Sequence, residues 1–260
     1  MTAMQKSVAI TRAVSPALAA CELTHLQRVA IDVDLARAQH RAYEEALIEA
    51  GYLVERLDTS LEMPDSVFVE DIAVVLDEVA IMTRPGAESR RRETPAVAEA
   101  LAAYRPLHVI QHPGTVDGGD VLVAGRRVFV GRSSRTNQAA VAQMRQLLEP
   151  LGYIVSDTVV RSCLHLKSAV TALGDDVLLV NRAWIDPEAF EGFTLVEVDP
   201  SEPSAANALR LDDRIVCSSA FPRTAERIAR RGLRLHTVDA SEVAKAEGAV
   251  TCCSLIVAGR

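Results

Sequence analysis

The fold of this 260-residue chain can be inferred outward from Val121-Leu122-Val123-Ala124-Gly125-Arg126-Arg127-Val128-Phe129-Val130. Two short apolar runs, Val121–Ala124 and Arg127–Val130, flank a turn signal at Gly125. Runs of this length around a glycine turn are typical of two paired strands. The stretch therefore predicts a β-hairpin.

A helix and a third strand follow this hairpin. Asn137 to Leu151 is amphipathic and ends at Gly152, and the apolar run Tyr153–Ser156 comes next. A glycine directly after the last periodic residue is a helix-stop signal. The segment from residue 121 to residue 156 thus predicts a unit of two strands, one helix and one further strand.

The same unit recurs along the chain. Other predicted helices are Val33–Ala50, Thr94–Ala103, a short one opening at Asp186-Pro187-Glu188-Ala189, and Pro222–Arg231. The strands expected after them are Tyr52–Leu57, Leu107–Ile110, Phe193–Val198 and Leu233–Val238. Further strand pairs are Ile72–Leu76 with Val79–Met82, and Ala169–Leu173 with Val177–Val180.

Repetition at this spacing indicates stacked supersecondary units rather than one continuous sheet. We expect five αβ modules in one domain over residues 1–260. The alternative is a doubly wound α/β sheet, against which the paired strands count, because simple alternation does not need them.

Composition restricts the class of partner. Hydrophobic residues make up 49% and charged residues 24%, which is typical of a soluble globular chain. The net charge of −7 argues against nucleic acid or an anionic membrane as a partner, and is compatible with a cationic small molecule. No run approaches the roughly 18 apolar residues that a membrane span needs.

The five cysteines are an odd number and show no CxxC spacing. A disulfide framework is not expected in a chain of this size, so we expect a cytoplasmic protein. Leu18-Ala19-Ala20-Cys21 resembles a lipoprotein cleavage site, but Arg12 and Pro16 interrupt the stretch before it. We expect no metal site and no cofactor.

Three polar segments are candidates for chemistry, and each has a simpler explanation. Asp65, Glu70 and Asp71 precede an apolar run, where acids usually form a solvated turn. They can instead wall a pocket for a guanidinium, whose planar fork matches carboxylate oxygens. The segment Asp117-Gly118-Gly119-Asp120 is a common tight turn, or it allows close backbone approach while Asp117 orients a histidine.

The third segment is Cys163-Leu164-His165-Leu166-Lys167-Ser168, taken with the distant Thr251-Cys252-Cys253-Ser254. A lone histidine between leucines is more often a core residue, and the cysteine pair can be small buried hydrophobes. A cysteine, a histidine and an aspartate are also the ingredients of an activated thiol. Each segment alone is a weak signal.

Their order along the chain is a stronger signal. The sequence contains Pro64-Asp65, Phe68-Val69-Glu70-Asp71, Thr83-Arg84-Pro85-Gly86-Ala87, Ser89-Arg90-Arg91, Asp117-Gly118-Gly119-Asp120-Val121-Leu122, Ser134-Arg135-Thr136-Asn137-Gln138, Leu164-His165-Leu166-Lys167-Ser168 and Thr251-Cys252-Cys253-Ser254. This succession closely resembles the dimethylarginine dimethylaminohydrolase (dimethylargininase) family of the guanidino-group-modifying superfamily. The resemblance runs from about Arg12 to the C-terminus.

The resemblance implies a fold and an activity. The fold is the pentein, a five-module α/β propeller of ββαβ-type units with pseudo-fivefold symmetry and a central site. The activity is hydrolysis of Nω-methylated arginines to citrulline and methylamine or dimethylamine, without a cofactor. The implied partner is a small methylated arginine, with no nucleic acid and no membrane, and a homodimer is left open.

Position by position, the resemblance also assigns roles. Cys252 matches the nucleophile, His165 the general acid/base, and Asp117 its orienting carboxylate, where some relatives have glutamate. The substrate-binding positions fall into three groups. Among the acids, Glu70 and Asp71 match residues around the guanidinium, and Asp65 matches another substrate-contacting acid. Arg90 and Arg135 match the residues that receive the α-carboxylate, and Leu18 and Ala246 those that hold the α-amino end.

Two other readings remain. One is another superfamily member, an arginine or other guanidine deiminase or an amidinotransferase. Arginine deiminases resemble this core plus a helical insertion, and their usual Cys-Met-Ser-Met-Pro ending is Cys-Cys-Ser-Leu-Ile here. The other is a non-catalytic binding protein on the same fold, which the joint presence of Cys252, His165 and Asp117 disfavours.

Overall fold

The hairpin at residues 121–130 is present in the structure, a computed structural model that describes residues 6–259. Strand β6 (Val121–Ala124) pairs antiparallel with β7 (Arg127–Arg132). Helix α3 (Gln138–Leu148) then leads to β8 (Ile154–Val159), which lies parallel to β7. A helical crossover is the usual way to join parallel neighbours.

Four further three-stranded sheets repeat this pattern, with an antiparallel pair followed by a parallel outer strand. One module consists of β3 (Ala73–Val75), β4 (Ala80–Met82), α2 (Thr94–Ala102) and β5 (Leu107–Val109), and a second of β9 (Val170–Ala172), β10 (Val177–Val180), the 3-10 helix η6 (Pro187–Phe190) and β11 (Thr194–Glu197). Another consists of β12 (Ala208–Leu211), β13 (Arg214–Ser218), α5 (Pro222–Ala229) and β14 (Arg234–Val238). The last consists of β15 (Leu255–Val257), β1 (Val8–Arg12), α1 (Val33–Glu49) and β2 (Leu53–Leu57).

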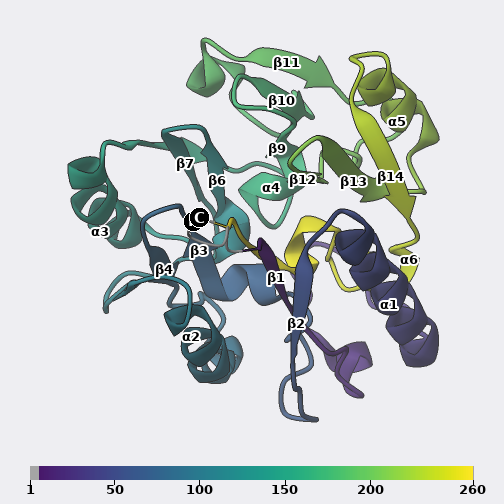
Figure 1. The fold of residues 1–260 in the computed structure, drawn as a ribbon, viewed down its shortest axis with the longest axis horizontal. Coiled ribbons are helices and arrows are strands. Elements are labelled where there is room, and N and C mark those ends of the chain that lie inside the picture. The colour runs from purple at the N-terminus through teal and green to yellow at the C-terminus, as the bar shows by residue number, and fades with distance from the viewer. Residues whose placement is uncertain (1–5, 260) are drawn as a thin grey trace, which may run out of the picture.

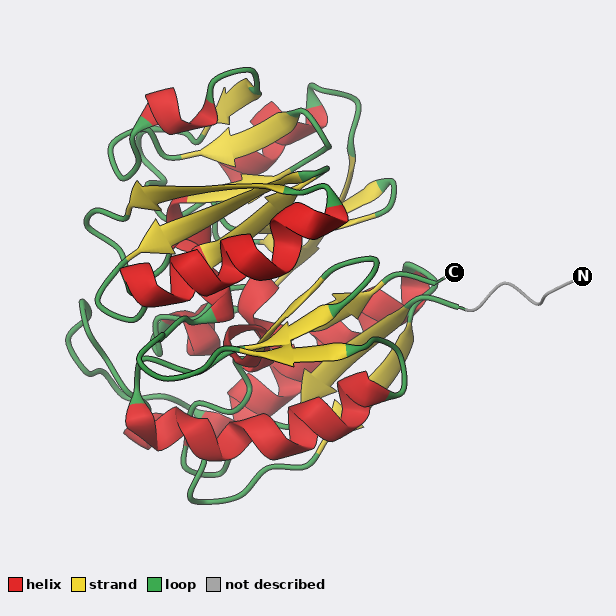
Figure 2. Cartoon of the chain, turned by 90° about the vertical axis from the view of Figure 1, so that its left-hand side faces the viewer, coloured by secondary structure: helices red, strands yellow, loops and turns green. Residues whose placement is uncertain are grey.

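The five sheets follow one another around a central axis, and the longer helices lie at the rim (Figures 1 and 2). The fifth sheet combines both ends of the described chain, because β15 pairs antiparallel with β1. Residues of the five inner strands, β3, β6, β9, β12 and β15, line one axial cavity of about 210 Å³. The predicted five-module propeller is therefore confirmed.

Local signals explain where the longer helices begin. The Asp32 carboxylate accepts from the Asp34 and Leu35 amides at the start of α1, and the Asn137 side chain accepts from the Ala140 amide at the start of α3. Such side chains satisfy backbone donors that the first helical turn leaves free. Helices α2 and α5 begin with a proline in the first turn, where its missing N–H costs nothing.

The core is divided in the same way as the sheets. Five hydrophobic clusters are found among residues 6–259, and each gathers chiefly around one module or the seam with its neighbour. Leu47, Leu101, Met144 and Ile228 are examples of rim-helix side chains that are almost fully buried. No helix within the described part of the chain is long and apolar enough to cross a membrane.

Candidate active site

Short helical turns carry the candidate residues, and each turn directly precedes an inner strand. Turn η2 (Val69–Ile72) precedes β3, η4 (Gly118–Asp120) precedes β6, α4 (Leu166–Ala169) precedes β9, and η7 (Thr251–Cys253) precedes β15. Because the inner strands surround one axis, the turns converge at one end of it. The fold thus brings together residues that are far apart in the sequence, such as Glu70 and Thr251, which are separated by 181 positions.

One small pocket at this end contains seven of the ten sequence-predicted site residues. Asp65, Asp71, Arg90, Arg135, His165, Ala246 and Cys252 line it. Asp117 lies behind His165, while Glu70 and Leu18 lie outside the lining. A larger cavity of about 340 Å³ shares Leu164, Glu247 and Gly248 with the pocket, but Cys252 and His165 do not line it.

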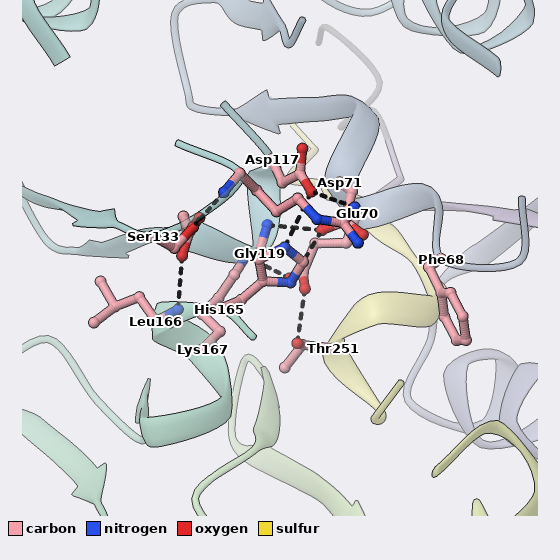
Figure 3. A network of polar contacts seen from close by, with 12 residues as sticks. Phe68, Glu70, Asp71, Asp117, Gly119, Ser133, His165, Leu166, Lys167 and Thr251 are labelled. Carbon is pink, nitrogen blue, oxygen red and sulfur yellow. Dashed lines mark hydrogen bonds and ion pairs between the residues drawn. The ribbon is translucent and has the colours of Figure 1, made fainter. Parts of the chain in front are cut away.

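His165 is held between two carboxylates. Its Nε2 lies 3.1 Å from Asp117 Oδ2, and its Nδ1 lies 3.7 Å from Asp71 Oδ1 (Figure 3). Burial alone lowers the pKa of His165, but the nearby Asp71 charge and the Asp117 hydrogen bond outweigh it and raise this pKa to about 9. The ring is therefore an imidazolium at neutral pH, able to donate a proton.

Glycine makes this arrangement possible. A Cβ on Gly119 would lie 2.6 Å from His165 Nδ1 and 2.8 Å from Asp71 Oδ1. The bare backbone lets the imidazole pack directly over η4, and the Gly119 N–H donates to Asp71 Oδ1 at 3.0 Å. The Asp117-Gly118-Gly119-Asp120 motif is thus a close approach as well as a turn.

Asp120 supports the histidine from the backbone side. Its Oδ1 accepts from the Leu166 amide at 2.9 Å, and its Oδ2 accepts from the Ser133 and Thr136 hydroxyls, each at 2.6 Å. Burial raises the pKa of this fully buried carboxyl to about 6. The carboxyl fixes the start of α4 and therefore the backbone of His165.

The adjacent acids Glu70 and Asp71 point into different spaces. Asp71 lines the active-site pocket, whereas Glu70 lines the axial cavity. Lys167 Nζ donates to Glu70 Oε1 at 2.5 Å, and the Thr251 hydroxyl donates to Oε2 at 2.8 Å (Figure 3). The structure therefore places Glu70 beneath the nucleophile turn, with both oxygens engaged.

Arg90 is part of a buried ion network. Its guanidinium pairs with Asp71 at 2.5 Å and with Glu93 at 2.9 Å, and it also donates to the Phe68 and Asp65 carbonyls. Burial opposes the charge, but Glu93 and Asp71 raise the pKa of Arg90 well above its ordinary value. Its cation offsets the Asp71 charge at the pocket wall.

A segment following η1 (Leu18–Ala20) covers the pocket. The Asp65 carboxylate accepts from the Glu22 amide at 3.1 Å, and the Glu247 carboxylate accepts from three amides, those of Thr24, His25 and Leu26. Arg135 Nη2 donates to the Thr24 hydroxyl at 3.2 Å. Pocket residues thus hold the covering segment closed.

The two α-amino candidates are placed differently. The Leu18 carbonyl accepts from the Cys21 amide at 3.0 Å within the covering segment, and its side chain is fully buried in the core. Ala246 lines the pocket itself.

Burial raises the pKa of Asp65 to about 6, although the Arg90 charge opposes this shift.

Cys252 lies in an environment that opposes ionisation. Burial, followed by the charges of Glu70 and Asp71, raises the pKa of its thiol well above the ordinary value. The same carboxylates attract a bound cation. The pocket therefore combines a thiol, a protonated histidine and acidic side chains, an arrangement suited to a guanidinium.

Ligand atoms of Asp71, Asp117 and His165 lie within 4.8 Å of one another, a spacing seen in metal sites. Here the carboxylates are already engaged: Asp71 pairs with Arg90, and Asp117 accepts from the Gly86 amide at 2.9 Å. These contacts favour a histidine–carboxylate network that handles protons.

Several pocket and network residues were not predicted from the sequence. Glu22, Phe68, Leu164, Glu247 and Gly248 complete the pocket lining. Gly248 gave no motif signal, yet a Cβ there would lie 2.1 Å from the Phe68 ring, so it lets that ring form the wall. Lys167 and Thr251 belong to the motifs that contain His165 and Cys252. The position of Lys167, two residues after a candidate catalytic histidine, was the sequence feature that could have indicated its role.

Comparisons with known proteins identify the family. Residues 23–198 match the family model described as N,N dimethylarginine dimethylhydrolase, eukaryotic. The chain is 44% identical over 254 residues to N(G),N(G)-dimethylarginine dimethylaminohydrolase of Streptomyces coelicolor, covering 97% of each protein. It is 38% identical to the Pseudomonas aeruginosa protein of the same name, covering 85% of this chain and 89% of that one.

Solved structures show the same relationship. A Cys-to-Ser variant of the Pseudomonas aeruginosa enzyme complexed with citrulline matches with a TM-score of 0.91 and 36% identity, covering 97% of this chain and 99% of that one. The N-terminal domain of ArgZ, an arginine dihydrolase, matches with a TM-score of 0.86 at 18% identity, which shows a shared fold alone. Since family model, close relatives and solved structure agree over most of its length, this chain belongs to the dimethylarginine dimethylaminohydrolase family.

Proposed function

We propose that this protein hydrolyses Nω,Nω-dimethyl-L-arginine and Nω-monomethyl-L-arginine to L-citrulline, releasing dimethylamine or methylamine. One observation carries the proposal: Cys252 and the Asp117-bound His165 share a pocket with the carboxylate of Asp71. The family relatives named for this reaction add support.

Binding comes first in the proposed mechanism. The substrate guanidinium lies against the acidic wall of Asp65 and Asp71, and Arg135 faces its α-carboxylate. The cation favours the Cys252 thiolate, because an added positive charge offsets the carboxylates that oppose ionisation. The thiol proton is released to solvent.

The thiolate sulfur then adds to the guanidinium carbon and forms a tetrahedral adduct. His165, as imidazolium, donates its proton to the dimethylamine nitrogen, and the C–N bond breaks. A thiouronium remains on Cys252. Neutral His165 next takes a proton from water, whose oxygen attacks the same carbon, and the C–S bond breaks to release citrulline. General acid–base help of this kind contributes about 10²–10⁴-fold.

The test is a citrulline assay with asymmetric dimethylarginine on wild type, Cys252→Ala and the control Cys217→Ala. Cys217 is buried in β13, away from the pocket lining. We expect citrulline from wild type and the control, and none from Cys252→Ala. Wild type that forms no citrulline would contradict the proposal and favour a binding protein.

A parallel incubation with arginine separates the proposal from the deiminase alternative. Ammonia released from arginine as efficiently as dimethylamine from dimethylarginine would assign the protein to the deiminase class. A cytoplasmic location stays a prediction of the sequence, which leaves a homodimer open.

A further inference from the structure

Asn207 lies in the module of β12, at the place that the turns η2, η4, α4 and η7 take in the other four modules. It directly precedes inner strand β12, as Asp120 precedes β6 and Ser254 precedes β15. Its side chain is buried, with 6% of its surface exposed. No sequence motif singled it out.

Both the nitrogen and the oxygen of the Asn207 side-chain amide are hydrogen-bonded, in three bonds altogether. Nδ2 donates to the Lys167 carbonyl at 3.0 Å and to the Thr251 hydroxyl at 2.9 Å. Oδ1 accepts from the Thr251 amide at 3.0 Å. A buried amide with all its partners present defines one geometry, because any displacement leaves a polar group unsatisfied.

These partners belong to the two segments that carry the candidate chemistry. Lys167 lies two residues after His165, and Thr251 immediately precedes Cys252. The Thr251 hydroxyl also donates to one oxygen of Glu70, and the Lys167 ammonium donates to the other (Figure 3). Glu70 therefore connects Lys167 and Thr251 a second time, independently of Asn207. Asn207 thus links the segment bearing His165 to the turn bearing Cys252.

We propose that Asn207 is a positioning residue that fixes the Cys252 nucleophile relative to His165, acting through Thr251 and the Lys167 carbonyl. The inference rests on the proposed function, since it deepens the account of that same site. Asn207 is absent from the lining of the small pocket that contains Cys252 and His165, although it lines the larger cavity beside it. Its proposed contribution therefore lies in geometry rather than in contact with the reacting group.

The role predicts a separation of kcat from KM. In Asn207→Ala the pocket wall of Asp65, Asp71 and Arg135 is retained, so KM should stay within about threefold, whereas a misplacement near 1 Å should lower kcat by about 10- to 100-fold.

Asn181→Ala is the matched control. Asn181 is also buried, and its side-chain amide bonds the Pro203 carbonyl at 2.8 Å and the Ala183 amide at 3.0 Å, without a side-chain hydrogen bond to either catalytic segment. Its backbone N–H donates to the Ala169 carbonyl at the end of α4, and alanine keeps that bond. Its kcat and KM should both remain near the wild-type values. Equal kcat values for the two variants would overturn the proposal.

Thr251 provides a second test through a double-mutant cycle. Thr251→Val removes the hydroxyl but keeps the shape, and should lower kcat, whereas Thr251→Ser should keep most of it. Because Asn207 acts through Thr251, the double variant should lose little more than the worse single variant. Losses in log kcat that simply add would overturn the proposal.

Hydrogen exchange gives a readout that does not depend on turnover. The Thr251 amide should exchange faster in Asn207→Ala than in wild type, relative to the core amide of Ile10, and should be unchanged in Asn181→Ala. Unchanged exchange of the Thr251 amide in Asn207→Ala would refute the positioning role of Asn207, even if wild type forms citrulline. Wild type without citrulline formation would refute the proposed function and leave this readout intact.

Discussion

The Cys252 thiol should be mostly protonated in the free enzyme at neutral pH. Burial and the charges of Glu70 and Asp71 raise its pKa, so the thiolate appears only as pH rises well into the alkaline range. Inactivation by iodoacetamide, followed against pH with Cys252 alkylation confirmed by mass spectrometry, measures this. A non-reactive guanidinium ligand in the pocket should shift the ionisation to lower pH.

A Cys252 thiol that is fully ionised below neutral pH without ligand would contradict this prediction. It would show that the Glu70 and Asp71 carboxylates do not set the pKa of the thiol. Burial raises the pKa of Cys217 to about 11, so this cysteine is the internal reference and should stay unmodified throughout the neutral range.

Asp117→Asn should disable proton transfer while keeping the shape of the site. The substitution removes the carboxylate that bonds His165 at 3.1 Å and helps to raise its pKa. We expect kcat to fall by about 10²–10⁴-fold, and the alkaline limb of the kcat profile to move to lower pH. Asp157→Asn, at a rim pair with Arg132 and Arg145, is the control and should change neither.

Protonated His165 should also stabilise the fold, and the sign of the effect follows from its pKa. The folded value of about 9 lies above the unfolded value of 6.5. The contribution is therefore complete below pH 6.5 and is lost as pH rises through about 9, amounting to about 3 kcal/mol of unfolding free energy.

Urea unfolding of wild type and His165→Gln at pH 6 and pH 9.5 measures this linkage. The wild-type free energy of unfolding should decrease between the two pH values by more than that of the variant. Identical pH dependence in the two proteins would show that His165 is not held as an imidazolium.

At the scale of elements, the turn η4 depends on a missing side chain. A Cβ at Gly119 would displace the His165 ring or the Asp71 carboxylate, so Gly119→Ala should lower kcat by about 100-fold. Gly174→Ala in the turn between β9 and β10 is the control, because its nearest neighbour would be 3.7 Å away. Its activity should equal that of wild type, and an equally active Gly119→Ala would contradict the close packing.

Strands and helices with regular periodicity were predictable, whereas elements formed by distant partners were not. The pair β6 and β7 and the helices α1, α2, α3 and α5 were predicted within a few residues. Near residue 187 the predicted short helix is present as a single four-residue 3-10 turn, η6, rather than as an α-helix. The pairs β12 with β13 and β15 with β1 were missed.

The physical reason differs between these two pairs. Strand β12 mixes Arg210 into an apolar run and begins after irregular chain, so no alternation marks it. Strand β15 pairs with β1 across almost the whole sequence, and local patterns carry no information about such a contact.

The candidate site shows the same division. The proposed roles of Cys252, His165 and Asp117 could be predicted from the family resemblance, because each residue lies in a motif of its own. The partnerships of Glu70 with Lys167 and of Asn207 with Thr251 join residues of four different modules. Only the closed ring places them in contact.

At the scale of the whole molecule, the acidity of −7 is less concentrated at the site than the sequence suggested. Glu70 is paired with Lys167, and Asp71 is paired with Arg90 and faces the His165 imidazolium. The pocket wall is therefore close to charge balance before substrate binds. A bound guanidinium is stabilised by individual carboxylates that the protein already holds in place, rather than by a large net negative charge of the pocket.

Ring closure leads to the last prediction. The ends of the described chain meet, because β15 pairs with β1 and the Gly259 amide donates to the Ser7 hydroxyl at 3.1 Å. A short glycine–serine linker joining residue 259 to residue 7, with new ends between Asp175 and Asp176, opens an exposed turn and leaves all five sheets complete. This permutant should keep kcat/KM within about threefold of wild type, with a lower Tm, because a ring of equivalent modules has no required starting point.

Opening the ring instead between the buried Gly118 and Gly119 should abolish citrulline formation, because it cuts the turn between Asp117 and the Asp71 contact. Citrulline assays and thermal unfolding of both permutants decide: an inactive or unfolded Asp175 permutant would show that closure at β1 and β15 requires the natural chain order.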